Sequence, residues 1–393
     1  MTTFTCLLPT WDIQNKRIIL RADLNVPLEN GVISNDYRLQ SLKPTLDYIR
    51  QHGGTTTILT HIGRPESPTP ALSTKHLLPW FKDNGYVVTW CATIQEAQAA
   101  LINNNQSFIL LENLRFFPGE KDHDTNFARD IAQLGDFYLD DAFASLHRDD
   151  SSITLVPTFF PPEKRSVGLL VEKELTMLDK LMISSKKPFA LVTGGGKVTD
   201  KIPLLFNMLN KVTDILLCPA TVFSFLYAQG KECGISLIDK NAATSCNEII
   251  TRAQQQNVTI HFPLDYQMSL DNTQGEIVIV DAHNIPHNGI GLSIGPKTIE
   301  RYSHIIRNAH TIFFNAAMGF PSRPETTVGT QALLHAIAQS NGFSVIGGGD
   351  SVAAAQKLQL DGQIDYLSTG GGATLTYLSG QELPGLKVLS HIK

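Results

Sequence analysis

The stretch PFALVTGGGKVTDKIPLLF, residues 188–206, contains the local pattern from which the fold can be predicted. It begins with an apolar run, 188–193, that is typical of a buried strand. Three glycines follow, then Lys197 and Lys201, and then a second apolar run. Because the two lysines are four positions apart, we expect them to share one face of the opening turns of a helix. The stretch therefore predicts a β-strand, a glycine turn and an α-helix.

The glycine triplet has two interpretations. Such glycines often serve only backbone conformation in a tight turn. Alternatively, the N–H groups at a helix start, with two ammonium groups beside them, favour an anion. The stretch is not a Walker A loop, because Leu191 and Val198 occupy the positions of that motif's first glycine and its Ser or Thr. Taken alone, it fits either interpretation.

Short apolar runs alternate with helical patterns along the whole chain, as in βαβ units and parallel sheets. A helical apolar stripe from Leu39 to Ile49 follows the first predicted strand. The predicted strands are 17–22, 55–60, 108–111, 137–139, 188–193, 214–217, 258–262, 276–280, 311–314, 344–346 and 366–368. The sequence therefore predicts an α/β fold with mainly parallel sheets.

The length of 393 residues exceeds what one hydrophobic core usually supports, so we expect two domains. Between the halves, Leu175, Leu178 and Leu181 or Met182 have helical spacing. We predict a first lobe over 1–170, a connecting helix over 171–187 and a second lobe over 188–375.

The composition of the chain argues against several classes of protein. The net charge of −5 argues against a nucleic-acid-binding protein, which needs a broad basic surface. The five cysteines are scattered, without the spacing of a zinc site or a disulfide framework. The first residues lack a basic region followed by an apolar core, and the longest apolar run, 215–228, is broken by Pro219. We therefore expect a cytoplasmic protein that is neither exported by a recognisable signal nor membrane-spanning.

Ligands bind at the carboxyl ends of parallel strands, so the residues that follow each strand are candidates for a binding site. In the first half, these residues and the start of the first helix supply Asp23, Asn25, Arg38, His61, Arg64, Arg115, His147 and Arg148. A single such arginine is usually a solvated surface residue, and either histidine could equally belong to the core. Because the cations recur at one edge, and guanidinium groups bind carboxylate and phosphate bidentately, the edge predicts a site for a small, multiply charged acid.

In the second half, the strands are followed by glycine-rich loops: TGGGK at 193–197, IGGGDSVAA at 346–354 and STGGGATL at 368–375. Three such loops let backbone approach a di- or triphosphate closely. Asp350 is either the N-cap of the next helix or a ligand of Mg²⁺ against phosphate oxygens. We favour the metal ligand, because phosphate-directed loops surround it.

Together these motifs resemble phosphoglycerate kinase over nearly the whole chain, from about Arg21 to Pro384. The resemblance is carried, in order, by RADLNVPL, the Arg38 helix, HIGRP, LENLRFF, DAFASLHR, GGGKVTDKI, IGGGDSVA and STGGGATL. It implies two Rossmann-like three-layer α/β/α lobes joined by a hinge helix, with the tail at about 376–393 packing on the first lobe. It further implies reversible phosphoryl transfer from 1,3-bisphosphoglycerate to Mg-ADP, giving 3-phosphoglycerate and ATP, by a monomer. In this context the glycine triplet is interpreted as a phosphate site.

The resemblance also assigns roles to individual residues. Arg38 and Lys197 would be catalytic, by neutralising the transferred phosphoryl group. The triose acid would be bound by Asp23, Asn25, Arg38, His61, Arg64, Arg115 and Arg148. The nucleotide would be bound by Gly195, Gly196, Lys197, Lys201, Asn315, Ser322, Gly348, Gly349, Asp350 and Ser351, with Asp350 on Mg²⁺.

The departures from the family pattern cluster at the nucleotide. Cys218, Pro219 and Ala220 stand where the family has three glycines near the base, and Ser322 stands where a glutamate would bind the ribose. The nearest carboxylate, Glu325, is three residues further on. The resemblance therefore supports specificity for the acid better than specificity for the base.

The sequence also contains evidence against two other functions. A non-catalytic triose-phosphate-binding homologue with a degenerate nucleotide site is disfavoured by the presence of Lys197, Lys201 and Asp350. A dinucleotide-dependent oxidoreductase would need G-x-G-x-x-G followed by an acidic residue about 20 positions later, and the sequence contains no convincing copy.

Overall fold

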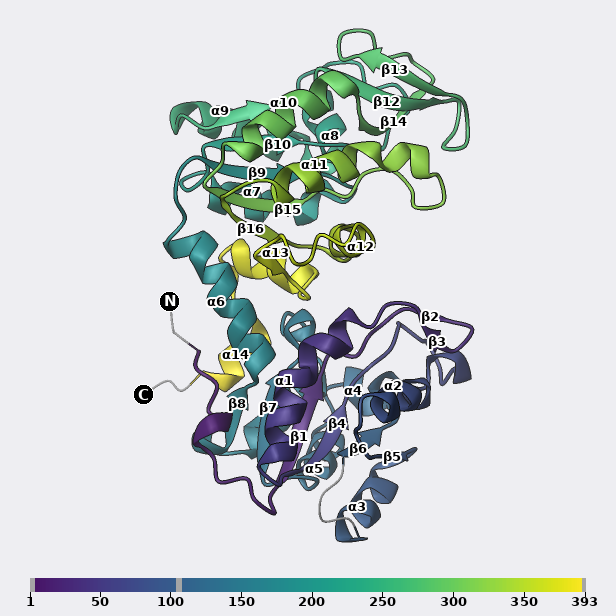
Figure 1. Ribbon diagram of the computed structural model, residues 1–393, viewed down its shortest axis with the longest axis vertical. Coiled ribbons are helices and arrows are strands. Elements are labelled where there is room, and N and C mark those ends of the chain that lie inside the picture. The colour runs from purple at the N-terminus through teal and green to yellow at the C-terminus, as the bar shows by residue number, and fades with distance from the viewer. Residues whose placement is uncertain (1–3, 104–107, 391–393) are drawn as a thin grey trace. The chain divides into compact units, whose positions relative to one another are not determined.

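A computed structural model of the chain describes residues 4–103 and 108–390. The chain forms two compact units (Figure 1). Unit 1 comprises Met1–Thr176 and Glu382–Lys393, and unit 2 comprises Met177–Gln381.

Unit 1 contains a six-stranded parallel sheet in the order β5-β6-β4-β1-β7-β8. β1 lies inside the sheet, and five of its six residues are buried, as expected for a strand covered on both faces. The elements are β1 Arg17–Ala22, β2 Leu28–Glu29, β3 Val32–Ile33, α1 Tyr37–Gln51, β4 Thr55–Leu59, α2 Leu78–Asp83, β5 Val88–Cys91, α3 Ile94–Asn103, β6 Phe108–Leu111, α4 Pro118–Lys121, α5 Thr125–Ala132, β7 Phe137–Asp141, β8 Arg165–Val167 and α14 Pro384–Leu389.

Unit 2 contains a second six-stranded parallel sheet, in the order β11-β10-β9-β15-β16-β17. β9 is buried at all five positions. The elements are β9 Phe189–Thr193, α7 Ile202–Met208, β10 Asp214–Leu217, α8 Thr221–Ala228, α9 Ala243–Gln255, β11 Thr259–His261, β12 Asp265–Leu270, β13 Ile277–Asp281, β14 Gly289–Ile294, α10 Pro296–Arg307, β15 Thr311–Asn315, α11 Val328–Ala338, β16 Phe343–Ile346, α12 Gly349–Lys357, β17 Tyr366–Leu367 and α13 Gly372–Leu378.

The predicted fold class is confirmed, since both large sheets are parallel and helices alternate with strands along the chain. The predicted strands at 17–22, 108–111 and 214–217 agree residue for residue with β1, β6 and β10. The edge strands β5 and β8 were not predicted, because they are short and only partly buried and therefore lack a continuous apolar run.

The segment predicted as a strand at 276–280 belongs to a different kind of sheet. It forms β13, which pairs antiparallel with β12, and β12 pairs antiparallel with β14 on its other side. Neither β12 nor β14 was predicted, because β12, DYQMSL, is half polar and β14, GIGLSI, contains two glycines. The predicted strand is therefore present, shifted by one residue, and lies in a small antiparallel sheet beside the mainly parallel ones.

The helix predicted over 171–187 is α6, Leu169–Ile183. It begins two residues earlier and ends four residues earlier than predicted, and the boundary between the units falls within it. The C-terminal helix α14 packs in unit 1, where the Gly385 N–H donates to the Leu146 carbonyl at 3.0 Å. Residues 391–393 of the predicted tail lie outside the described residues.

All five cysteines are buried and free. In the part of the chain that the structure describes, no helix has the length and apolar character needed to cross a bilayer.

Candidate functional site

The cationic residues predicted for the first site lie at the carboxyl edge of the unit 1 sheet. Asp23 follows β1, His61 follows β4, Arg115 follows β6 and Arg148 follows β7. These four strands are consecutive neighbours in the sheet, in the order β6-β4-β1-β7. Chain order reverses between β1 and β7, and this is the position at which open α/β sheets bind ligands.

Arg38 enters this edge from the first turn of α1. Its guanidinium Nη1 donates to the Asp23 carboxylate, which is 2% exposed, whereas the Arg38 side chain is 26% exposed. Asn25 Oδ1 accepts from the Gly63 N–H at 2.8 Å and so connects the loops that follow β1 and β4. Asp23 thus holds Arg38 in place and leaves part of its guanidinium accessible.

His61 is a buried, neutral imidazole surrounded by arginines. Its Nδ1 lies 3.1 Å from Arg21 Nη2, and its Nε2 lies 3.4 Å from Arg148 Nη1. Burial and then the charges of Arg21 and Arg148 hold the His61 pKa well below its usual value. Because a guanidinium can only donate, the shorter contact assigns the lone pair to Nδ1 and the proton to Nε2. His61 can therefore donate a neutral hydrogen bond to an anion.

Arg115 and Asp150 form a buried ion pair, with Nη2 and Oδ2 separated by 2.9 Å. Lys121 Nζ lies 3.1 Å from the other oxygen of Asp150. Arg115 Nε is buried without a hydrogen-bond partner among the described residues, and so is His147 Nδ1. Because an unsatisfied buried donor costs free energy, a ligand that accepts from Arg115 would remove that cost.

Arg148 and Arg64 complete the predicted set. Burial and the neighbouring Arg115 lower the pKa of Arg148, so its charge is held in a partly dehydrated and positive environment. Arg64 is exposed and has no ion pair within the described residues. The arginines of this edge outnumber the carboxylates that pair with them, Asp23 and Asp150, so the edge has an excess of positive charge.

Sequence reasoning missed Arg21 as a site residue. It lies in β1, is fully buried, and donates from Nε to Ser152 Oγ at 2.9 Å. Ser152 Oγ in turn donates to Glu120 at 2.7 Å. Burial raises the Glu120 pKa to about 7, although Arg21 opposes this shift. The sequence did contain a signal for this role. An arginine inside the apolar run RIILRA must be buried, and a buried charge requires polar partners.

The second predicted site lies where chain order reverses in the unit 2 sheet, between β9 and β15. The Gly194–Lys197 loop follows β9, and Asn315 ends β15. Asn315 Nδ2 donates to the Gly347 carbonyl at 2.8 Å, which connects β15 to the glycine loop after β16. Gly348 has φ +92°, and a Cβ there would lie 2.5 Å from Asn315 Nδ2. Only glycine fits this position, whereas a Cβ at Gly349 would meet open space.

The expectation that Lys197 and Lys201 share a helix face is wrong. Lys197 has a left-handed backbone, with φ 54°, and lies before a 3₁₀ turn over Val198–Asp200. The helix α7 begins only at Ile202, with proline in its first turn, so the lysines flank a turn rather than share a helix. The two lysine side chains therefore do not lie on one face of a helix.

Lys201 is 7% exposed, and its ammonium donates to the Gly194 carbonyl. Burial lowers its pKa to about 8. Lys197, in contrast, is exposed. Of the two lysines, only Lys197 is presented to solvent beside the glycine loop.

Ser322 and Glu325 lie in the exposed segment after β15. Glu325 Oε1 accepts from Arg323 Nε at 3.0 Å. Arg323 also donates to the Thr273 carbonyl at 2.6 Å, in the turn between β12 and β13. The carboxylate nearest to Ser322 in the sequence is therefore held by an arginine that is itself anchored.

Asp350 lies in the first turn of α12, and the N-cap is Gly348. The interpretation of Asp350 as the N-cap is therefore wrong. No group of three metal-ligating side chains occurs within the residues that the structure describes. Mg²⁺ does not require such a group, because it binds through one or two carboxylates together with substrate phosphates. The exposed Asp350 carboxylate beside the glycine loop fits this mode.

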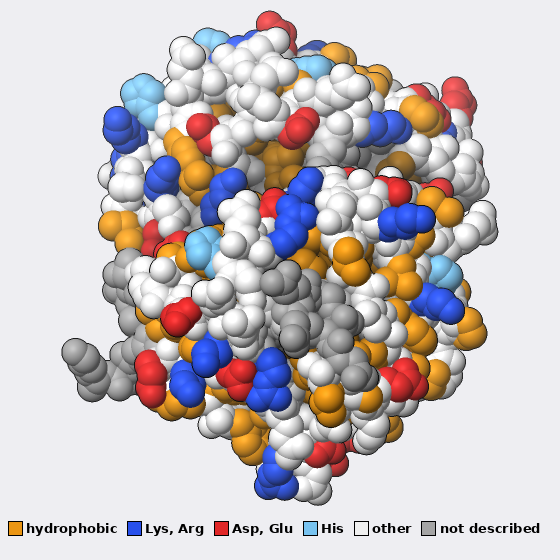
Figure 2. All heavy atoms as spheres, turned by 60° about the horizontal axis from the view of Figure 1, so that its bottom comes forward, with side chains coloured by type: hydrophobic (Ala, Val, Ile, Leu, Met, Phe, Trp, Pro, Cys, Tyr) orange, Lys and Arg blue, Asp and Glu red, His pale blue; other side chains and the backbone are white. Residues whose placement is uncertain are grey.

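On the face drawn in Figure 2, basic and acidic side chains are interspersed. The net charge of −5 for the whole sequence agrees with a cationic site that is local.

Comparison with known proteins identifies the family. A family model described as phosphoglycerate kinase matches residues 8–381. The chain is 36% identical over 387 residues to the phosphoglycerate kinase of Prosthecochloris aestuarii, covering 96% of this chain and 97% of the relative. It is 36% identical over 389 residues to that of Bdellovibrio bacteriovorus, covering 96% of each.

Solved structures agree with these relatives. The phosphoglycerate kinase structure from Coxiella burnetii superposes with a TM-score of 0.80 at 31% identity, covering 97% of both chains. The structure from Pyrococcus horikoshii superposes with a TM-score of 0.84 at 29% identity, covering 97% of this chain and 98% of the other.

Proposed function

This chain belongs to the phosphoglycerate kinase family, and we propose from that premise which of its residues bind and act on each substrate. It is a phosphotransferase that reversibly transfers the acyl phosphate of 1,3-bisphosphoglycerate to ADP, giving 3-phosphoglycerate and ATP. This reaction belongs to glycolysis and gluconeogenesis.

The triose acid binds at the carboxyl edge of the unit 1 sheet. The observation that carries this assignment is the excess of arginine over carboxylate there, together with the unsatisfied Nε of Arg115. The carboxylate and the phosphate of the triose acid supply anionic oxygens, which can accept hydrogen bonds from the arginines of this edge. The ligand is bound by Asp23, Asn25, Arg38, His61, Arg64, Arg115 and Arg148.

The nucleotide binds at the glycine loops of unit 2. Their backbone N–H groups and Lys197 receive the phosphates, and the Asn315–Gly347 hydrogen bond keeps two of the strand ends together. Asp350 would hold Mg²⁺, and the metal would neutralise phosphate charge there. Adenine is the expected base, and by the family resemblance Cys218, Pro219 and Ala220 would lie near it.

The protein promotes the reaction mainly by positioning the substrates and by neutralising charge on the transferred phosphoryl group. In a loose phosphoryl-transfer transition state, negative charge spreads over the equatorial oxygens, and little covalent work is left to the protein. Arg38 and Lys197 neutralise this charge as it develops. Arg38 suits the role because Asp23 fixes its orientation while its guanidinium stays partly exposed.

We also propose that the enzyme acts in the cytoplasm as a monomer. Five free cysteines are consistent with a reducing compartment. Sedimentation at several protein concentrations tests the monomer, and a concentration-dependent increase in mass would contradict it.

A coupled assay with 3-phosphoglycerate and Mg-ATP tests the proposal directly, with NADH oxidation by a downstream dehydrogenase as the readout. Turnover that depends on both substrates and on Mg²⁺ is expected. Binding of 3-phosphoglycerate without turnover would instead support a non-catalytic triose-phosphate-binding homologue.

A further inference from the structure

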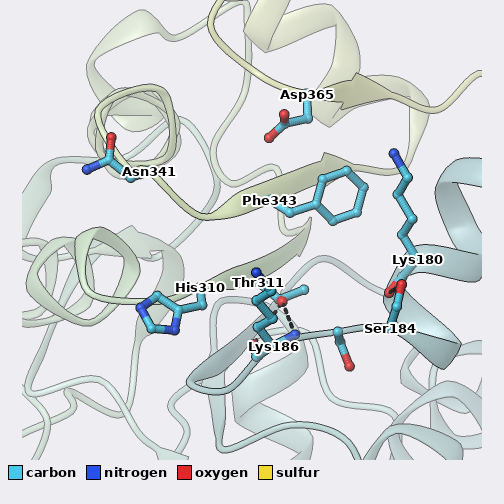
Figure 3. A pocket seen from close by; sticks show the side chains of 9 residues that line it. Lys180, Ser184, Lys186, His310, Thr311, Asn341, Phe343 and Asp365 are labelled. Atoms are coloured by element: carbon cyan, nitrogen blue, oxygen red, sulfur yellow. Dashed lines mark hydrogen bonds between the residues drawn. The ribbon is translucent and has the colours of Figure 1, made fainter.

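A pocket of about 540 Å³ lies in unit 2 at the edge of the sheet opposite to the glycine loops (Figure 3). Its lining includes His310 and Thr311 at the start of β15, Phe343 at the start of β16, and Asp365 just before β17. Lys180 enters from the last turns of α6. The pocket is therefore at the amino ends of the strands and is separate from the proposed nucleotide site.

Three basic side chains face this pocket from different elements. They are Lys180, Lys186 and His310, and within the described residues none of them forms an ion pair. The Lys180 ammonium lies 5.4 Å from the centre of the Phe343 ring. His310 Nδ1 lies 2.8 Å from the Lys187 carbonyl, which orients the ring and assigns a proton to Nδ1. The two lysine ammonium groups face a single carboxylate, Asp365, so the lining carries an excess of positive charge that an anion would balance.

A structural role at the C-terminus of α6 does not account for these lysines. Helix ends attract cations because their last carbonyls are unpaired. In this chain, Lys211 Nζ already donates to the Met182 carbonyl at 2.6 Å. Lys180 and Lys186 make no such contact with the helix end in the described structure.

The lining holds one carboxylate, Asp365, and one of its oxygens is held by hydrogen bonds. Asp365 Oδ2 accepts from the Ser344 N–H at 2.9 Å and from Ser344 Oγ at 3.1 Å. The segment carrying Lys186 is also fixed, because its N–H donates to Thr311 Oγ1 at 2.9 Å (Figure 3). The pocket therefore combines a rigid backbone with an excess of positive charge.

We propose that this pocket binds a small organic phosphate monoester. Lys180 and Lys186 would bind the phosphate, with Ser184, Ser185 and Asn341 as further hydrogen-bonding groups. The volume exceeds what a bare phosphate ion fills, and the Phe343 ring supplies an apolar wall for the organic part. The inference concerns unit 2 alone and does not depend on the proposed assignments of the substrate sites.

Isothermal titration of the full chain with ribose 5-phosphate tests the pocket, with inorganic phosphate as a second probe. The pocket variant is Lys180→Gln combined with Lys186→Gln. The matched control, Lys231→Gln combined with Lys357→Gln, removes the same charge from exposed positions elsewhere in unit 2. The titrations are run without 3-phosphoglycerate, because it is itself a phosphate monoester and would compete for the pocket. Binding of ribose 5-phosphate at the substrate sites is common to the wild type and both double variants, so the pocket variant measures it separately.

We expect ribose 5-phosphate to bind the wild type and the control equally, and the pocket variant at least tenfold more weakly. Turnover of the pocket variant should stay near that of the wild type, which verifies its fold. Absent binding to the wild type, or equal affinity in both double variants, would overturn the site. Binding of inorganic phosphate as tight as that of ribose 5-phosphate would overturn the inference that the organic part is recognised.

Discussion

The two units prepare their sheet edges for ligands in different ways. In unit 1 the edge consists of charged side chains that are already held in place, such as Arg38 by Asp23 and Arg115 by Asp150. In unit 2 the edge consists mainly of glycine backbone, and Lys201 is turned inward onto the Gly194 carbonyl. One edge is organised by ion pairs and the other by loop conformation.

This difference follows from the amount of charge that each edge must hold without a ligand. Arginines packed together need carboxylates behind them, and Asp23 and Asp150 are both almost fully buried. Backbone N–H groups carry no net charge, so a glycine loop needs no counter-ion when empty. We therefore expect substitutions in unit 1 to disturb both charge balance and catalysis, and substitutions in unit 2 to act mainly on the bound nucleotide.

The largest effect is expected for Arg38→Ala. If Arg38 meets charge that develops only in the transition state, kcat should fall by about 10²–10³-fold, with a smaller rise in KM for 3-phosphoglycerate. Steady-state kinetics measures both constants. Arg50→Ala is the control, because Arg50 lies at the other end of α1 in an exposed pair with Asp47.

Removing Arg38 also leaves the buried Asp23 without its partner, so thermal unfolding must be measured beside kcat. Arg38→Lys keeps the charge without the planar guanidinium and should recover part of the turnover. If Arg38→Ala is stable and retains most of the wild-type turnover, Arg38 has no catalytic role.

Lys197→Ala is expected to lower kcat by about 100-fold, since Lys197 is the exposed ammonium beside the glycine loop. Its stability should change by about 0.5 kcal/mol or less, because alanine and lysine meet similar strain at a left-handed φ. Lys357→Ala, an exposed lysine at the end of α12, is the control. A kcat near that of the control would show that Lys197 is an ordinary surface residue.

Ser322→Glu is expected to tighten Mg-ADP binding by about tenfold, because a restored ribose contact is worth roughly 1.5–3 kcal/mol. Glu325→Ala should leave Kd unchanged, since Arg323 holds that carboxylate. The test compares the Kd for Mg-ADP, measured by calorimetry, among the two variants and the parent protein. The opposite result, no change for Ser322→Glu and a large loss for Glu325→Ala, would show that the ribose contact has moved to Glu325.

The smallest expected effect is the pH dependence of Mg-ADP binding. Burial lowers the Lys201 pKa to about 8, so its ammonium loses its proton as the pH rises through that value. The ammonium is held on the Gly194 carbonyl, where its positive charge acts on phosphate from behind the glycine loop, and Mg-ADP affinity should therefore decrease between pH 7 and pH 9, by less than about tenfold. Lys201→Met should bind more weakly at pH 7 and lose this pH dependence. An unchanged pH dependence in Lys201→Met would show that the charge of Lys201 does not act on the bound phosphate.

Local sequence was sufficient to predict the strands that lie inside the two parallel sheets. Strands such as β1, β6 and β10 are buried on both faces and therefore read as continuous apolar runs. Because parallel strands share one carboxyl edge, the residues that follow them can be assigned to a common edge from the sequence alone. The cationic edge of unit 1 and the glycine loops of unit 2 were both predicted in this way.

Tertiary structure alone decided which way the side chains at those edges turn. The sequence spacing of Lys197 and Lys201 suggested one shared face, but a left-handed residue and a 3₁₀ turn separate them, and Lys201 is buried. Arg21 reads as a strand residue, and only the packed unit shows it beside His61. The apolar pattern of a buried strand can be recognised from a few consecutive residues. The direction and charge state of a buried polar group depend instead on partners from distant segments, such as Ser152 for Arg21.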